Sequence, residues 1–130
     1  MGYVKVKTKI WNVKNPKLAK KLELLADPEA VYTVLPKSLL KELKVEVVGK
    51  RKFRLANNEV VEKEVGIIGV EVNGLITHTF TVFGDENIFL FGVVTLEELG
   101  LQVDPVKGKL KPLELLLMNI FRFNKVSFHI

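Results

Sequence analysis

Two asparagine turns set between runs of apolar residues constrain the fold of this chain more than any other feature. The turns are Asn57-Asn58 and Asn73-Gly74. Asparagine and glycine tolerate the positive φ that a tight hairpin requires. The strands that these turns would join cover residues 53–55 and 60–65 for the first, and residues 67–72 and 76–83 for the second. Residues 3–13 also alternate in hydropathy with a period of two, so the sequence predicts a mainly β chain.

Further elements follow from local composition. Asn15-Pro16 indicates a turn before the next strand. Pro36 suits the first turn of a short helix, and Thr95 with Glu98 three residues later predicts the N-cap of a second, closed by Gly100. The helices should cover residues 36–43 and 95–100. Other segments expected to be extended are residues 22–25, 31–35, 45–48, 50–55, 88–91 and 101–103, while 109–117 fits either an extended or a helical form.

Composition excludes several kinds of chemistry. The 130 residues include no cysteine, which removes disulfides, thiolate zinc sites and cysteine nucleophiles. No H-E-x-x-H, P-loop or G-x-G-x-x-G pattern is present, and His78 and His129 are isolated. We therefore expect a protein without metal or cofactor. No apolar run reaches the ~20 residues of a membrane span, and the N-terminus lacks the apolar core of a signal peptide, so a soluble, cytoplasmic protein is expected.

The net charge of +5 comes mostly from lysine. Lys5, Lys7 and Lys9 occupy alternate positions of the first predicted strand and should form one solvated face. No basic helix stripe or interleaving of arginine with aromatic residues accompanies them. A nucleic-acid partner is therefore disfavoured, although a basic adaptor that binds nucleic acid stays open as an alternative.

Asp27 is the carboxylate with the greatest chemical interest. It follows the apolar run that ends at Ala26 and precedes a second apolar strand. Taken locally, an aspartate at such a turn caps its own backbone. The wider segment, Ala26-Asp27-Pro28-Glu29-Ala30-Val31-Tyr32-Thr33-Val34-Leu35-Pro36, resembles the active-site segment of the retropepsin-like (retroviral-type) aspartic proteases. That family carries apolar-Asp-Thr/Ser-Gly-Ala and then a strand ending in Val-Leu-Pro.

Three later blocks resemble the same family in order and spacing. The first is similar to its flap hairpin, which would bind substrate, and comprises Phe53, Arg54, Leu55, Ala56, Asn57 and Asn58. The second, Leu90-Phe91-Gly92 after Phe89, resembles the segment that supports the catalytic loop. The third is the predicted helix that ends at Gly100. The resemblance implies a closed β-barrel, a half-domain of the acid-protease type with one or two short helices, over residues 1–117. Residues 118–130 would be its C-terminal tail.

The resemblance assigns Asp27 as the catalytic residue and Pro28, Glu29 and Ala30 as the rest of the active-site loop. In this family two aspartates, one from each subunit of a homodimer, share a proton. Pro28 replaces the threonine or serine whose hydroxyl and amide tie the two loops together, and proline supplies neither donor. Glu29 replaces a glycine whose amide orients the aspartate. Two copies would therefore gather four carboxylates near one axis.

These departures leave three hypotheses. The first is a homodimeric retropepsin-like homologue, catalytically impaired or inactive, kept as a peptide-binding or assembly module. The second is an active aspartic endopeptidase that uses Asp27 from each subunit on peptide or unfolded protein. The third is the basic adaptor. Asn58 stands where the family usually has glycine, and we expect it to adopt the left-handed conformation of a tight hairpin.

Overall fold

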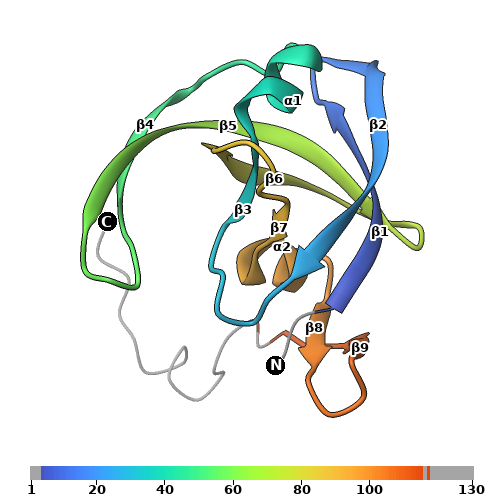
Figure 1. Ribbon diagram of the computed structural model, residues 1–130. Coiled ribbons are helices and arrows are strands. Elements are labelled where there is room, and N and C mark those ends of the chain that lie inside the picture. Colours follow the sequence, from blue (N-terminus) through green and yellow to red (C-terminus); the bar gives the residue numbers. More distant parts are fainter. Residues whose placement is uncertain (1–3, 116, 118–130) are drawn as a thin grey trace, which may run out of the picture.

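The computed structural model of the protein describes residues 4–115 and residue 117, and within them the fold is mainly β (Figure 1). This confirms the predicted fold class. The two short helices are α1 (Lys37–Glu42) and α2 (Val93–Glu98). The strands are β1 (Val4–Asn12), β2 (Asn15–Ala26), β3 (Thr33–Pro36), β4 (Gly49–Arg54), β5 (Val60–Val72), β6 (Leu75–Gly84), β7 (Leu90–Phe91), β8 (Leu101–Asp104) and β9 (Lys109–Pro112).

Seven strands form one sheet that curls into a ring. Their order is β1-β2-β7-β3-β6-β5-β4, and β1 also pairs with β5. That second pairing matches Lys9 with Glu71 and Trp11 with Gly69, and it closes the barrel. β4 lies outside the ring and pairs with the first half of β5, and this hairpin reaches out from the barrel at the left of Figure 1. Strands β8 and β9 form a separate two-stranded sheet.

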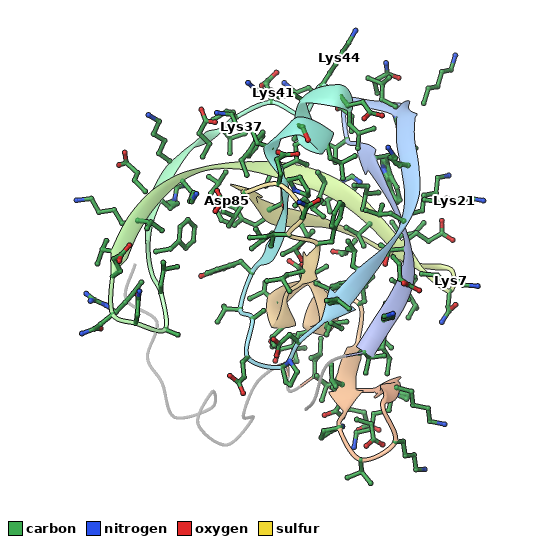
Figure 2. The ribbon with its side chains drawn as sticks, viewed as in Figure 1. Lys7, Lys21, Lys37, Lys41, Lys44 and Asp85 are labelled. Carbon is green, nitrogen blue, oxygen red and sulfur yellow. The ribbon has the colours of Figure 1, made fainter. Side chains whose placement is uncertain are left out.

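The core follows from strand alternation. On β1 the side chains of Val6, Thr8 and Ile10 are buried, whereas Lys5 and Lys7 are exposed. Figure 2 shows Lys7 of the predicted lysine face, and Lys21 of β2, pointing away from the barrel. The largest fully buried apolar side chains are Phe91, Ile10, Leu24, Leu35, Leu40, Ile68 and Leu96, which come from strands all round the ring and from both helices. Burying each such side chain contributes roughly 1.5–3 kcal/mol.

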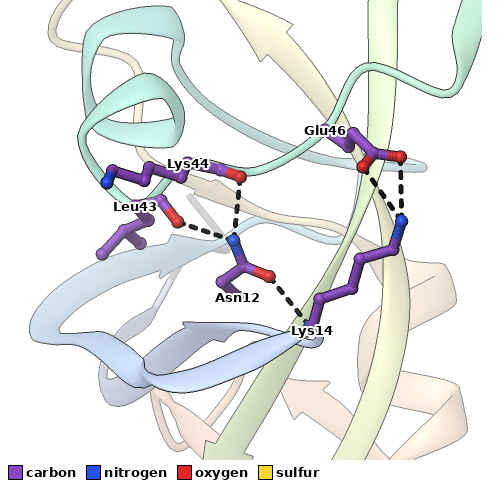
Figure 3. Close-up of polar contacts among 5 residues, drawn as sticks. All are labelled: Asn12, Lys14, Leu43, Lys44 and Glu46. Carbon is purple, nitrogen blue, oxygen red and sulfur yellow. Dashed lines mark hydrogen bonds and ion pairs between the residues drawn. The ribbon is translucent and has the colours of Figure 1, made fainter.

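Asn12 attaches the β1–β2 turn to the end of α1 (Figure 3). Its side-chain amide donates hydrogen bonds to the carbonyl oxygens of Leu43 and Lys44, both at 2.8 Å, and its Oδ1 accepts the amide of Lys14 at 2.8 Å. The Lys14 side chain pairs with Glu46 at 2.9 Å beside it. Buried polar groups of this kind need full partners, and Asn12 has them.

Two strand predictions were wrong. β2 begins at Asn15 and not at residue 22, because Asn12 already pairs with Asn15 across a turn at Val13 and Lys14. Proline is tolerated at a bulge, and Pro16 lies where the register between β1 and β2 shifts, so it did not mark the turn. The segments 60–65 and 67–72 form the single strand β5. Gly66 lies inside it, where an added Cβ would meet the Glu46 carbonyl oxygen at 2.7 Å.

The predicted N-cap of the second helix was also wrong. The N-cap of α2 is Gly92, without a side-chain hydrogen bond, and Thr95 lies inside the helix with its side chain buried. The first helix begins one residue later than expected, with Pro36 as its N-cap. The predicted tail, residues 118–130, lies outside the described residues. Among the residues that the structure describes, no helix is long and apolar enough to cross a membrane.

Candidate functional site

The loop that carries Asp27 is a tight turn at the end of β2. The Asp27 Oδ1 oxygen accepts the amide of Glu29 at 2.9 Å, and the Asp27 carbonyl oxygen accepts the amide of Ala30 at 3.0 Å. Asp27 is half-buried, while Pro28 and Glu29 are exposed. The carboxylate is therefore oriented by the backbone of the residue that replaces the glycine of the resembled motif.

The first residues of α2 donate hydrogen bonds to the backbone of this loop. The amides of Val93 and Val94 donate to the carbonyl oxygens of Ala30 and Val31, at 2.8 and 3.0 Å. The first amides of a helix have no partner within the helix, so the loop supplies the acceptors that they need. The loop and the helix thereby hold one another in place.

The segment Leu90-Phe91-Gly92 fixes the same loop by pairing and by close contact. Leu90 and Phe91 pair in parallel with Leu25 and Ala26, which places β7 beside the strand that leads into Asp27. Phe91 is fully buried. An added Cβ at Gly92 would lie 2.3–2.5 Å from backbone atoms of residues 31–33, so only glycine fits there.

Buried threonines extend this support into the core. The Thr95 hydroxyl is 2.7 Å from that of Thr33 and 2.8 Å from that of Thr79. Thr33 also accepts the amide of Gly92 at 3.1 Å, and the Thr81 hydroxyl donates to the Thr33 carbonyl oxygen at 3.2 Å. Sequence reasoning missed this network. The available signal was that Thr79 and Thr81 take alternate positions on β6 beside the apolar residues Phe80, Val82 and Phe83.

The flap hairpin, meaning β4, the first half of β5 and the turn between them, has the predicted turn chemistry. The Asn58 amide donates to the Leu55 carbonyl oxygen at 2.9 Å, and the Leu55 amide to that of Glu59 at 2.8 Å. Asn58 has φ +74°, which confirms the expected left-handed conformation. Asn57 Oδ1 accepts the Glu59 amide at 3.0 Å. Ala56, like both asparagines, is exposed at the turn.

A groove of about 780 Å³ lies between the flap hairpin and the strands below it. Its lining includes Glu29 and Ala30 of the loop and Leu90 of β7, but among the described residues it does not include Asp27 or Pro28. Of the predicted flap residues, Phe53 and Leu55 line the groove, whereas residues 56–58 of the turn do not. The remaining lining residues are Val31, Tyr32, Val34, Lys52, Arg54, Glu59, Val61, Lys63, Val82, Gly84, Asp85 and Ile88.

The wall of the groove is apolar and its rim carries both charges. The rim cations are Lys52, Arg54 and Lys63, and the rim anions are Glu29, Glu59 and Asp85. Lys63 Nζ pairs with Asp85 Oδ1 at 3.1 Å, which links β5 to the residue after β6. Among the described residues, no three carboxylate or imidazole side chains gather in a way that could hold a metal ion.

A closed ring of strands with two short helices and a projecting hairpin is consistent with the fold of a retropepsin-like half-domain. Of the solved structures, the foamy viral protease-reverse transcriptase, in complex with an RNA/DNA hybrid, is similar to this chain, with a TM-score of 0.53 and 17% identity. The match covers 96% of this chain and 14% of the viral chain. At this identity the likeness shows the fold alone. No family model matches the chain, and no curated protein matches it.

Proposed function

We propose that two copies of this chain form a retropepsin-like homodimer that binds an extended peptide or unfolded segment, with peptide cleavage impaired or lost. The groove between the flap hairpin and the loop of residues 29–34 is the observation that carries the proposal. It has the apolar wall expected of a peptide side-chain pocket, and charged side chains of both signs accompany that wall. One chain supplies one aspartate loop and one flap hairpin, so a complete cleft needs a second copy about a twofold axis.

Impaired cleavage follows from the residues after Asp27. Acid-protease chemistry depends on two carboxylates held rigidly enough to share one proton and activate a water. Pro28 has neither the hydroxyl nor the amide that would join the two loops across the dimer. Glu29 adds a second carboxylate per subunit near the axis, where like charges oppose one another. Preorganisation supplies a large share of catalytic rate, so its loss should weaken cleavage far more than it weakens binding.

Two measurements test this proposal. Light scattering at micromolar concentration should report twice the monomer mass. Ten-residue peptides selected from a randomised displayed pool should bind the full-length protein, and Leu55→Asp or Val61→Asp in the groove should reduce their affinity at least tenfold. The matched control is Val106→Asp, because Val106 is 91% exposed and distant from the groove lining. A strictly monomeric protein, or selected peptides that ignore both groove variants, would contradict it.

One observation favours the second candidate, an active aspartic endopeptidase. The Glu29 amide still donates to Asp27 Oδ1 at 2.9 Å, so the orienting hydrogen bond that the resemblance assigns to glycine is present here. Cleavage of unfolded protein at mildly acid pH by the wild type, abolished by Asp27→Asn, would establish the enzyme. Equal turnover by the wild type and Asp27→Asn would show that the cleavage does not depend on Asp27. The proposed function would then remain the binding module.

A further inference from the structure

We infer that Tyr32 is a positioning residue that holds the flap hairpin over the groove and closes the groove at one end. Its ring makes edge-to-face contacts with Phe53 of β4, at a centroid distance of 5.9 Å, and with Phe80 of β6, at 5.7 Å. Both Tyr32 and Phe53 line the groove. The two sides of the groove therefore contact one another through this pair, because Tyr32 belongs to the segment after the aspartate loop and Phe53 to the flap hairpin.

The backbone of Tyr32 is fixed independently of its ring. Gly92 packs against its carbonyl carbon so closely that an added Cβ would lie 2.3 Å away. On either side, Val31 accepts the amide of Val94 and Thr33 is held by the buried hydroxyl network. Because this backbone is held firmly, the Tyr32 side chain has a fixed position, and the projecting hairpin can pack against it.

Few strand pairings tie the flap hairpin to the barrel: of residues 60–65, only Val65 pairs with β6. Within the described residues, β4 pairs with β5 alone. The two ion pairs that link this part of β5 to the body, Lys63–Asp85 and Lys37–Glu64, have partly exposed side chains and so contribute little. Arg51 adds one more contact, since its guanidinium carbon lies 6.0 Å from the centre of the Phe80 ring. Tyr32, Arg51, Phe53 and Phe80 therefore form one cluster between the hairpin and the barrel.

The cluster gives Tyr32 a second role in choosing the ligand, and this part rests on the proposed peptide binding. Tyr32 is 39% exposed and lines the groove. A bound peptide side chain that reaches this end must stop at the ring. Removing the ring should lengthen the groove, so that a bulkier side chain is accepted there.

The positioning role can be tested without any ligand by amide hydrogen exchange on the full-length protein. Tyr32→Ala should speed exchange of two amides about fivefold or more. They are the Val48 amide, which is bonded to Val65 where the hairpin joins the barrel, and the Leu55 amide, which is bonded to Glu59 at the turn. The amides of Val45 and Leu99, bonded around the two helices, should exchange as in the wild type. Tyr32→Phe keeps the ring and should behave as the wild type. Val31→Ala is the matched control, because Val31 is an exposed neighbour that lines the same groove and has no ring of its own.

A double variant identifies the partner. Once Tyr32 is alanine, Phe53→Leu should add no further acceleration of flap exchange, whereas alone it should speed exchange by a similar factor. Tyr32→Leu guards against misfolding, because it keeps an apolar side chain while removing the edge-to-face contacts. Unchanged flap exchange in both Tyr32→Leu and Tyr32→Ala, or equal acceleration at Val45 and Leu99, would overturn the inference. These outcomes do not depend on whether a peptide binds.

The ligand-selecting role has its own readout. Peptides selected on Tyr32→Ala should carry a larger side chain at one position than those selected on the wild type, while Tyr32→Phe selects the wild-type set. Identical selections on all three proteins would overturn this role alone. If no protein selects any peptide, the proposed function fails, and the exchange result still decides the positioning role.

Discussion

The amide of Gly92 donates a hydrogen bond to the Thr33 hydroxyl at 3.1 Å, and the two residues are 59 positions apart in the chain. Glycine makes this contact possible, since any side chain at position 92 would enter the backbone of the aspartate loop. The segment that follows the aspartate loop is thus fixed by a residue from the other half of the chain.

Gly92→Ala should destabilise the protein by about 3 kcal/mol. The new methyl group meets backbone atoms at 2.3–2.5 Å, and backbone yields less readily than the end of a side chain. Chemical denaturation would measure the free energy of unfolding. Gly49→Ala is the matched control, because the nearest atom to its Cβ is a flexible guanidinium nitrogen of Arg51. A loss at Gly92 no larger than that at Gly49 would contradict the packing described.

Thr95→Val should cost about 1–3 kcal/mol, because it leaves the buried hydroxyls of Thr33 and Thr79 without their shared partner. Thr79→Val should cost less, since that hydroxyl has a single partner in the network, and the double variant should cost less than the sum of the two. Thermal and denaturant unfolding would check this order. Thr77→Val, on the same strand but outside the network, should change stability by less than either, and strict additivity would argue against the network.

Asn12→Asp should destabilise the protein by about 2–3 kcal/mol. The replacement loses the amide that donates to Leu43 and Lys44 and turns a carboxylate toward their two carbonyl oxygens. Lys14→Met removes the nearby ion pair with Glu46, whose side chains are 70% and 66% exposed, and should change the free energy of unfolding by no more than about 0.5 kcal/mol. The reverse ranking would mean that the ion pair, and not Asn12, holds the turn to α1.

Pro28→Thr combined with Glu29→Gly should raise peptidase activity at mildly acid pH. The change restores a hydroxyl and an amide to the loop and removes one carboxylate per subunit. The gain should vanish when Asp27→Asn is added. Because acid also breaks Asp-Pro bonds, fragments ending at Asp104 must be discounted, and the variant that carries Asp27→Asn shows their level. A folded, dimeric double variant without any gain would show that the cleft lacks more than these two residues.

The sequence predicted the hairpins well, because asparagine and glycine at turns and alternating apolar residues act locally. It misplaced Thr95 because the capping-box pattern takes no account of partners far along the chain. Thr33 and Thr79 satisfy the Thr95 hydroxyl inside the core, and these contacts outweigh a cap on the helix. Pro16 misled for a related reason, since the register of β2 against β1 decides where the turn falls.

The candidate site was predictable only in part. The segment around Asp27 and the supporting glycine carry a recognisable pattern, and the structure places them in contact. Tyr32 carries no such pattern, because its importance depends on Phe53 and Phe80, which reach it only through the fold. Whether Asp27 and Glu29 work in catalysis depends on what faces them across the proposed dimer axis, which the local sequence does not encode.

The seam between β1 and β5 also has a consequence for folding kinetics. Its four residue pairs join parts of the chain roughly sixty residues apart, whereas the β1–β2, β4–β5 and β5–β6 hairpins join neighbours. Local hairpins close quickly, and distant pairings must first overcome the entropy of a long loop. Ring closure should therefore be the late step of folding. A chain paused before it would expose the free edges of β1 and β5, so refolding yield should fall as protein concentration rises.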